Sequence, residues 1–239
     1  MSSTASLATA GTSHRRVRSR FRNAVRVQQA ITAPIERKVL LWLAERTPET
    51  ISPDHLTALG FAAQFLAGAS YALARWNKYA LLLAAFFIAV NWLGDSLDGT
   101  LARYRQKLRP RYGFYVDHMA DTFGAVFLMS GLALSGFLHW QIAVGMLVGF
   151  LVLSVESYLT TYTIGKFPMS HGLFGPTEIR ILLMIGNIAL FFRPYVHRLG
   201  HEFLLFDIGG AIAIAGMLGM AVVATVRHTL ALYREERLS

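Results

Sequence analysis

The sequence contains no cysteine, and only 15% of its 239 residues are charged. Without thiols, disulfide bonds, thiolate nucleophiles and cysteine-ligated zinc sites are all excluded. Such scarce charge, together with 54% hydrophobic residues and a mean hydropathy of +0.42, is unlike an ordinary soluble domain. The composition therefore indicates a protein that lies in a membrane.

Long uncharged runs support this interpretation. Residues 56–74 and 122–155 carry no Asp, Glu, Lys or Arg, and about 18 such residues are enough to cross a bilayer. Breaks rich in Pro, Gly and charge separate the runs. We expect an all-α integral membrane protein, with no internal repeat and one membrane domain over residues 31–236. Its six transmembrane helices are predicted at residues 54–75, 78–104, 112–136, 140–164, 176–192 and 205–232.

The residues before the first span predict two further segments. Pro34 suits the first turn of a helix, and Ile35, Val39 and Leu43 form one apolar stripe after it. We therefore expect a short amphipathic helix over residues 34–46, lying in the membrane interface. Residues 1–30 are polar and basic, which favours a flexible arm and shows no cleavable signal peptide.

Negative charge is scarcer than positive charge, with 14 Asp and Glu against 23 Lys and Arg. Six spans would place nineteen of the basic residues on one side, including Arg105, Lys107, Arg109 and Arg111, and four on the other. The positive-inside rule then predicts that both termini lie in the cytoplasm. We expect the protein to lie in the cell (inner) membrane. The expected partner of this charge is anionic lipid, not nucleic acid.

Four of the scarce acids gather in one stretch, "GDSLDGTLARYRQKLRPRYGFYVDHMAD", from Gly94 to Asp121. Asp95 and Asp98 are three residues apart and Asp117 and Asp121 are four apart, so each pair shares one helical face. A short connection between the two spans would turn the pairs toward each other near the cytoplasmic side. The spacing therefore predicts a site made of four carboxylates.

A divalent cation explains why carboxylates stand there. Each charged side chain inside a membrane helix costs roughly 2.5–3.5 kcal/mol on insertion scales, and neighbouring carboxylates repel each other. Ligation by carboxylates alone favours Mg²⁺, Mn²⁺ or Ca²⁺. We expect Asp95, Asp98, Asp117 and Asp121 to hold two such ions, as in two-metal phosphoryl transfer.

Two neighbours of these acids suit a phosphate ligand. Gly99 allows a ligand to approach the backbone closely, and Arg103 lies about one turn beyond it on the same face. Because arginine binds phosphate through two parallel hydrogen bonds, the stretch predicts a diphosphate-binding surface.

The stretch resembles the signature of the CDP-alcohol phosphotransferases, D-x2-D-G-x2-A-R followed by G-x3-D-x3-D. Nine residues separate its two halves, and the matching residues are Asp95, Asp98, Gly99, Ala102, Arg103, Gly113, Asp117 and Asp121. The segment "SPDHLTALG" also resembles the start of the family's first span, although Asp54 stands where Asn is more usual. The resemblance covers about residues 30–232.

The resemblance implies a reaction and residue roles. In this family an acceptor hydroxyl attacks the β-phosphate of a CDP-linked donor and CMP leaves, a step of phospholipid synthesis. The resemblance implies that the four aspartates bind metal and that Asp121 is also the general base. It implies that the CDP group contacts Asp98, Gly99, Ala102, Arg103, Gly113 and, more weakly, Thr57.

The segment from Glu156 to Arg180 bears on the acceptor. It loosely resembles choline and ethanolamine phosphotransferases, as does the Asp117–His118 pair, which implies a diacylglycerol-like acceptor. Lys166, His171 and Arg180 instead suit an anionic polyol phosphate, as in phosphatidylinositol-phosphate or phosphatidylglycerol-phosphate synthases. We favour the first slightly. The candidate acceptor contacts are Glu156, Lys166, Glu178, Arg180 and His118, with an internal ion pair among Glu156, Glu178 and Arg180 as the alternative.

Small residues raise the question of oligomeric state. Gly145 and Gly149 form G-x-x-x-G, and Ala211, Ala215 and Gly219 repeat at spacing four. Such faces let membrane helices approach closely, either within one chain or between two. The family's habit of dimerising favours a homodimer through the fourth span.

A protein of another class, a cation carrier, would also place acids in a membrane. It would distribute them through the depth of the bilayer. The clustered aspartates beside Arg103 favour the transferase.

Overall fold

The computed structural model describes residues 25–27, 32–168, 175–198 and 201–236. These residues contain seven helices, which begin and end within three residues of the ranges expected from the sequence. They are α1 Ala33–Arg46, α2 Pro53–Ala74, α3 Ala80–Tyr104, α4 Pro110–Leu134, α5 Trp140–Thr163, α6 Pro176–Phe192 and α7 Leu205–Glu235.

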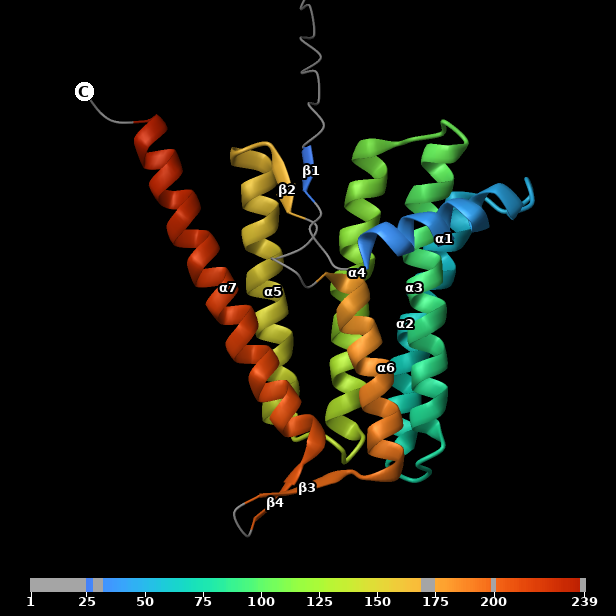
Figure 1. The fold of residues 1–239 in the computed structure, drawn as a ribbon, viewed down its shortest axis with the longest axis vertical. Coiled ribbons are helices and arrows are strands. Elements are labelled where there is room, and N and C mark those ends of the chain that lie inside the picture. Colours follow the sequence, from blue (N-terminus) through green and yellow to red (C-terminus); the bar gives the residue numbers. More distant parts are fainter. Residues whose placement is uncertain (1–24, 28–31, 169–174, 199–200, 237–239) are drawn as a thin grey trace, which may run out of the picture.

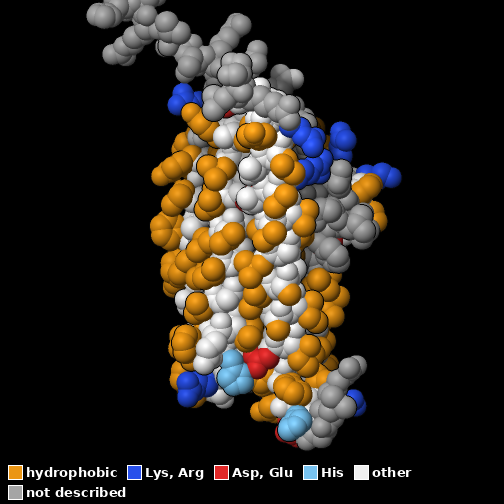
Figure 2. Space-filling model, turned by 90° about the vertical axis from the view of Figure 1, so that its left-hand side faces the viewer, with side chains coloured by type: hydrophobic (Ala, Val, Ile, Leu, Met, Phe, Trp, Pro, Cys, Tyr) orange, Lys and Arg blue, Asp and Glu red, His pale blue; other side chains and the backbone are white. Residues whose placement is uncertain are grey.

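Four helices in the described part of the chain are long and apolar enough to cross a membrane: α2, α3, α5 and α7. The protein is therefore an all-helical, multi-pass membrane protein. On the side where α7 lies, hydrophobic side chains cover the middle of the molecule and Lys and Arg gather toward its ends (Figure 2). Helices α4 and α6 lie among the other long helices (Figure 1), although α6 has only 17 residues.

Local sequence explains where several helices start. Proline occupies the first turn of α1, α2, α4 and α6, where a missing backbone N–H leaves no bond unmade. At the start of α2 the Ser52 hydroxyl accepts from the His55 N–H, and the His55 ring accepts from the Ser52 N–H. This reciprocal pair satisfies backbone groups that a helix end leaves open.

The helices form two groups, α1 to α4 with α6, and α5 with α7, and a cavity lies between them. Helix α2 packs against α3 and α4, while α3 also packs against α6 and α1. Helix α5 packs against α4 and α7, and α7 leans away from the other helices toward its C-terminal end (Figure 1). Helix α1 lies across the bundle beside α3, where Leu40 and Ala44 pack on Leu97 and Leu101.

Glycines let α2 approach both of its neighbours. A Cβ atom on Gly94 of α3 would lie 2.6 Å from the backbone N of Gly60 in α2. A Cβ atom on Gly131 of α4 would lie 2.0 Å from the carbonyl oxygen of Gly68 in α2. Because these glycines have no side chains, the backbones of α3 and α4 can both lie against α2, which brings α3 and α4 near each other.

A polar contact secures the first crossing. The Asn91 side-chain amide of α3 donates to the Gly60 carbonyl at 3.0 Å and to Gln64 Oε1 at 3.2 Å. Hydrogen bonds between membrane helices fix their register as well as their distance. Asp95 follows Asn91 by one turn of α3, so this contact also fixes where Asp95 lies along the neighbouring helix α2.

The G-x-x-x-G pair packs within the chain. Cβ atoms on Gly145 and Gly149 of α5 would lie 2.7 Å from Ile214 Cδ1 and 3.2 Å from Met217 Cε of α7. The intramolecular alternative is therefore the one that the structure shows for these two glycines. The second set of small residues, Ala211, Ala215 and Gly219, lies exposed on α7, and the homodimer stays a prediction.

Four short strands were not expected. Strand β1 (Val25–Val27) pairs in parallel with β2 (Lys166–Pro168), which follows α5. Strands β3 (Tyr195–Arg198) and β4 (His201–Leu204) form an antiparallel hairpin between α6 and α7. Apart from Val25–Val27, the predicted arm over residues 1–30 lies outside the described residues.

The glycine crossings make a prediction about stability. Gly131→Ala places a methyl group on a backbone oxygen, so α4 has to move, and we expect a loss of roughly 1–3 kcal/mol of unfolding free energy. The matched control is Gly219→Ala on α7, where a Cβ meets nothing within 4 Å. Thermal unfolding in detergent should show a lower midpoint for the first variant alone. Equal midpoints for both would contradict the close crossing.

Candidate active site

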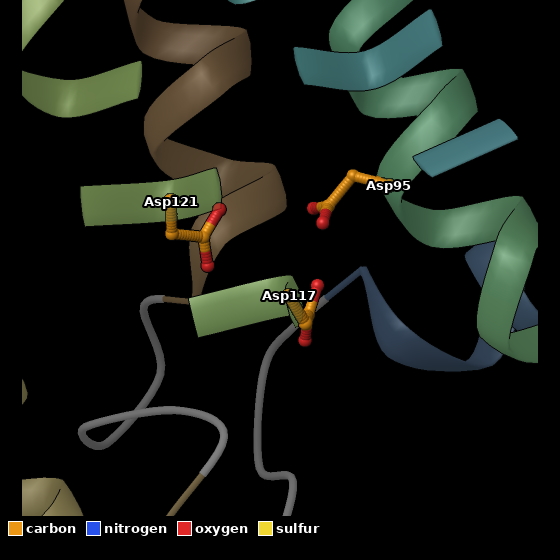
Figure 3. A group of neighbouring side chains, drawn as sticks. All are labelled: Asp95, Asp117 and Asp121. Carbon is orange, nitrogen blue, oxygen red and sulfur yellow. The ribbon is translucent and has the colours of Figure 1, made fainter. Parts of the chain in front are cut away.

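Three aspartates converge where α3 passes α4. Asp95 lies on α3, Asp117 and Asp121 lie on α4, and their nearest carboxylate oxygens are all within 4.8 Å of one another. The three side chains point toward one another from the two helices (Figure 3). Oxygens bound to one hard cation at about 2.0–2.6 Å can be at most about 4–5 Å apart. The three carboxylates therefore fit a single cation of that kind.

The charges in this group also call for a cation. Two like charges about 4 Å apart repel by roughly 4 kcal/mol near a protein surface, and three carboxylates make three such pairs. Among the ion pairs of the described residues, this group makes one with a guanidinium: Arg180 Nη2 on α6 donates to Asp95 Oδ2 at 2.6 Å. One positive charge against three negative charges leaves a deficit that a divalent ion matches.

Asp98 lies one turn beyond Asp95 and is held separately. Its Oδ2 accepts a 2.5 Å hydrogen bond from the Thr57 hydroxyl of α2, and its Oδ1 accepts from the Gly99 N–H. Among the described side chains, the three-carboxylate group does not include it. The structure thus brings three of the four expected metal ligands together and places the fourth beside them.

The aspartates lie at one end of a large cavity of about 1860 Å³. The charged residues that border the cavity include Asp95, Asp98, Arg103, Asp117, Asp121, Arg180 and Glu36. Farther in, the lining is mostly apolar and comes largely from α4 to α7, with Leu132, Met146, Leu183 and Phe206 among its residues. The cavity is therefore amphipathic, with its charged end at the aspartates.

The residues expected to contact CDP line the same cavity. Gly99, Ala102, Arg103, Gly113 and Thr57 all border it. A Cβ atom on Gly99 would lie 3.6 Å from Arg103 Nη1, so the guanidinium extends back over the glycine. A Cβ atom on Gly113 would meet nothing within 4 Å, which leaves open space beside the α4 backbone.

Two of the expected acceptor residues also reach the cavity. Arg180 borders it, and its ion partner is Asp95, not the Glu156 or Glu178 of the alternative. His118 borders it as well, with its ring 4.1 Å from Phe114 and 4.9 Å from Tyr158 between centroids. His118 Nδ1 lies 3.7 Å from Asp117 Oδ2. Both residues therefore stand next to the carboxylate group.

Two further acceptor candidates, Glu156 and Glu178, have partners away from the cavity. Glu156 Oε1 lies 2.6 Å from His228 Nδ1, which joins α5 to α7. Glu178 Oε1 accepts from the N–H and the hydroxyl of Thr32 at the start of α1. Neither carboxylate is among the described residues around the cavity. Lys166 lies in β2 with its side chain not described, and His171 lies outside the described residues.

Several structural residues near the site were missed by sequence reasoning. Arg105 was read as a charge at the membrane surface, but its guanidinium donates to the carbonyls of Thr47, Pro48 and Ile51. These contacts fix the connection between α1 and α2. They join residues more than fifty positions apart, so no local pattern signals them.

A second missed contact accounts for the unusual residue at position 54. Asp54 stands where the family more often has Asn, and its Oδ1 accepts from Arg109 Nη2 in the connection between α3 and α4. An acid at this position therefore gains a local basic partner.

The comparisons with known proteins identify the family of this chain. The sequence pattern of the CDP-alcohol phosphatidyltransferases matches residues 50–227. The chain is 30% identical to the archaetidylinositol phosphate synthase of Pyrococcus horikoshii, covering 68% of this chain and 81% of the relative. It is 31% identical to an uncharacterised protein of Aquifex aeolicus, covering 59% and 69% of the two chains. The resemblance found in the sequence is confirmed: the chain belongs to the CDP-alcohol phosphatidyltransferase family and is a transferase of phosphate-containing groups.

Proposed function

We propose that this enzyme transfers the phosphate-linked lipid of a CDP-linked donor to a hydroxyl of a polyol phosphate and releases CMP. The observation that carries the proposal is the convergence of Asp95, Asp117 and Asp121 at the charged end of an otherwise apolar cavity. Such a cavity suits a substrate with a nucleotide at one end and lipid chains at the other. The enzyme thereby acts in phospholipid synthesis, as its family does.

The choice of acceptor rests on two observations. The slight preference for choline or ethanolamine chemistry finds no support in the comparisons, because the relative with a named activity is an archaetidylinositol phosphate synthase. In addition, Arg180 lies in the cavity beside Asp95, where a guanidinium suits an anionic acceptor. Both favour the inositol-phosphate alternative, with Arg180 and His118 on the acceptor side.

A divalent ion, with Mg²⁺ first and Mn²⁺ or Ca²⁺ as alternatives, would be held by Asp95, Asp117 and Asp121. Asp98, kept in place by Thr57, is the carboxylate available to a second ion. Held there, such ions would neutralise negative charge on the transferring phosphate and on the leaving CMP.

The protein's own groups supply the remaining steps. Arg103 and the open backbone at Gly99 and Gly113 bind the diphosphate and the cytidine end. The oxygen of the acceptor hydroxyl attacks the β-phosphate, and the Asp121 carboxylate accepts the proton of that hydroxyl. The bond from that phosphorus to the CMP oxygen breaks, and CMP leaves.

The same proposal places the site at the cytoplasmic face of the cell (inner) membrane. The aspartates lie near the connection between α3 and α4, which carries Lys107 and Arg109. We infer that α4 and α6 also cross the membrane, which gives six spans. Helix α1 lies in the interface, because Ile35, Val39 and Trp42 are exposed along its outer side.

A cation carrier fits the structure less well. A transport path needs polar groups along its length, whereas the cavity beyond the aspartates is lined by side chains such as Leu132, Met146 and Leu183. Cation flux into liposomes containing the protein, with no CDP-linked substrate, would favour the carrier instead.

The transferase makes a direct prediction for Asp121. Purified protein given Mg²⁺, CDP-diacylglycerol and inositol phosphate should release CMP, and Asp121→Asn should lower the rate by about 10²–10⁴-fold because the base is lost. The control is Asp207→Asn on α7, which bonds His139 in the connection before α5 and should keep wild-type turnover. Mass spectrometry of the lipid product identifies the acceptor. Unchanged release in Asp121→Asn, or product only from CDP-choline and diacylglycerol, would count against the proposal.

A second prediction concerns Thr57. Thr57→Val keeps the shape of the side chain but removes the donor to Asp98, a hydrogen bond to a charged group. We expect about a tenfold higher Mg²⁺ concentration at half-maximal rate. Thr57→Ser keeps the hydroxyl and should behave as the wild type. If the valine variant has the same metal requirement as the wild type, Thr57 does not position Asp98.

A further inference from the structure

We propose that Glu36 of α1 is a positioning residue of this enzyme: it fixes the start of α6 against α3 and so keeps Arg180 in contact with Asp95. The inference rests on the proposed function in one respect, that Arg180 stands on the acceptor side of the site. Glu36 belongs to a helix that the sequence predicts only as a membrane-interface segment.

One carboxylate oxygen of Glu36 joins three helices. Glu36 Oε1 accepts from Trp92 Nε1 at 3.1 Å and Ser96 Oγ at 3.1 Å, both on α3. It also accepts from Thr177 Oγ1 on α6 at 2.8 Å. A charged acceptor makes each of these bonds stronger than a neutral one. The side chain thus ties α1, α3 and α6 at a single point.

That point lies next to the Asp95–Arg180 ion pair. Ser96 directly follows Asp95 on α3, and Thr177 precedes Arg180 by three residues, about one helical turn. Glu36 therefore holds both helices within one turn of the two charged partners. The Arg180 side chain is 13% exposed, and its Nη2 lies 2.6 Å from Asp95 Oδ2, so a small shift of α6 would lengthen this contact.

A reciprocal contact strengthens the same junction. Glu178 of α6 accepts from the Thr32 N–H at 2.9 Å and from the Thr32 hydroxyl at 2.7 Å, just before α1. Its other oxygen accepts from the Gly175 N–H at 2.9 Å, which caps α6. The starts of α1 and α6 thus each accept hydrogen bonds from the other, so α1 acts as a brace for α6.

The brace matters because α6 packs mainly on one helix, α3, and makes few contacts with α7. Helix α6 packs chiefly against α3, and its close contact with α7 is near its far end, where a Cβ on Gly186 would lie 2.7 Å from Phe206. Between these ends α6 borders the cavity. The position of Arg180 therefore depends on the junction with α1.

The kinetic test is a double-mutant cycle between Glu36 and Arg180. Glu36→Ala should raise the KM for inositol phosphate about tenfold and leave the KM for CDP-diacylglycerol within about twofold. In an Arg180→Ala background the same change should add less than about twofold, because its effect passes through Arg180. Glu36→Gln keeps an acceptor oxygen and should restore most of the affinity.

Equal losses in both backgrounds, or an effect on the donor instead, would overturn the inference. If Glu36→Ala does not fold, Thr177→Val serves in its place, since it removes the α6 bond alone, with Thr177→Ser as its control. A wild-type protein that releases no CMP would refute the proposed function and leave the placement of α6 to the next measurement.

A second readout needs no turnover. Because the chain has no native cysteine, spin labels can be attached at Tyr104→Cys on α3 and Ile181→Cys on α6, both exposed positions. We expect a narrow distance distribution by pulsed electron resonance in the otherwise unchanged protein and in Glu36→Gln. Glu36→Ala should broaden it. An unchanged distribution in Glu36→Ala would overturn the positioning role whatever the kinetics show.

Discussion

The close approach of α2 to α3 and α4 is the constraint on which the site depends. Asp95 and the pair Asp117 and Asp121 lie on different helices, and carboxylate side chains are short. They meet within 4.8 Å because glycines at two crossings let both helices press on α2. With larger residues there, the helices would separate and the carboxylates would move apart. The close packing at the glycines thus determines how near the three carboxylates lie to one another.

Bringing three carboxylates together costs electrostatic free energy, and neighbouring residues offset part of this cost. Arg180 pairs with Asp95, and Thr57 and the Gly99 N–H bond Asp98. These contacts satisfy single oxygens but leave the group of three carboxylates strongly negative. A divalent ion held by the three carboxylates would offset their mutual repulsion. This favours metal-dependent transfer, as the family implies.

Much of the fold followed from the sequence because helices have local signals. Uncharged runs, prolines at helix starts and charged breaks placed every helix within three residues. The aspartates were identifiable because their spacing of three and four residues is itself helical. Their family signature added the link to CDP-linked donors, which the comparisons support.

The partners of polar side chains did not follow from the sequence. The alternative ion pair of Arg180 with Glu156 or Glu178 was wrong, because its partner is Asp95, 85 positions away, while its acceptor role stays a prediction. Glu156 instead joins α5 to α7, and Glu178 holds the start of α1. Such pairings depend on which faces the helices present to each other. A single sequence gives the faces of each helix but not how the helices are rotated and ordered.

Helix α1 is an example of a helix whose outer face was expected from the sequence, whereas the partners of its inner face were not. Its sequence predicts a segment that rests on the membrane surface, and Ile35, Val39 and Trp42 on its outer side agree with that role. Its inner side carries Glu36, whose carboxylate receives bonds from α3 and α6. In the proposed placement, α1 has one face toward lipid, and Glu36 on its other face connects it to the helices that carry Asp95 and Arg180.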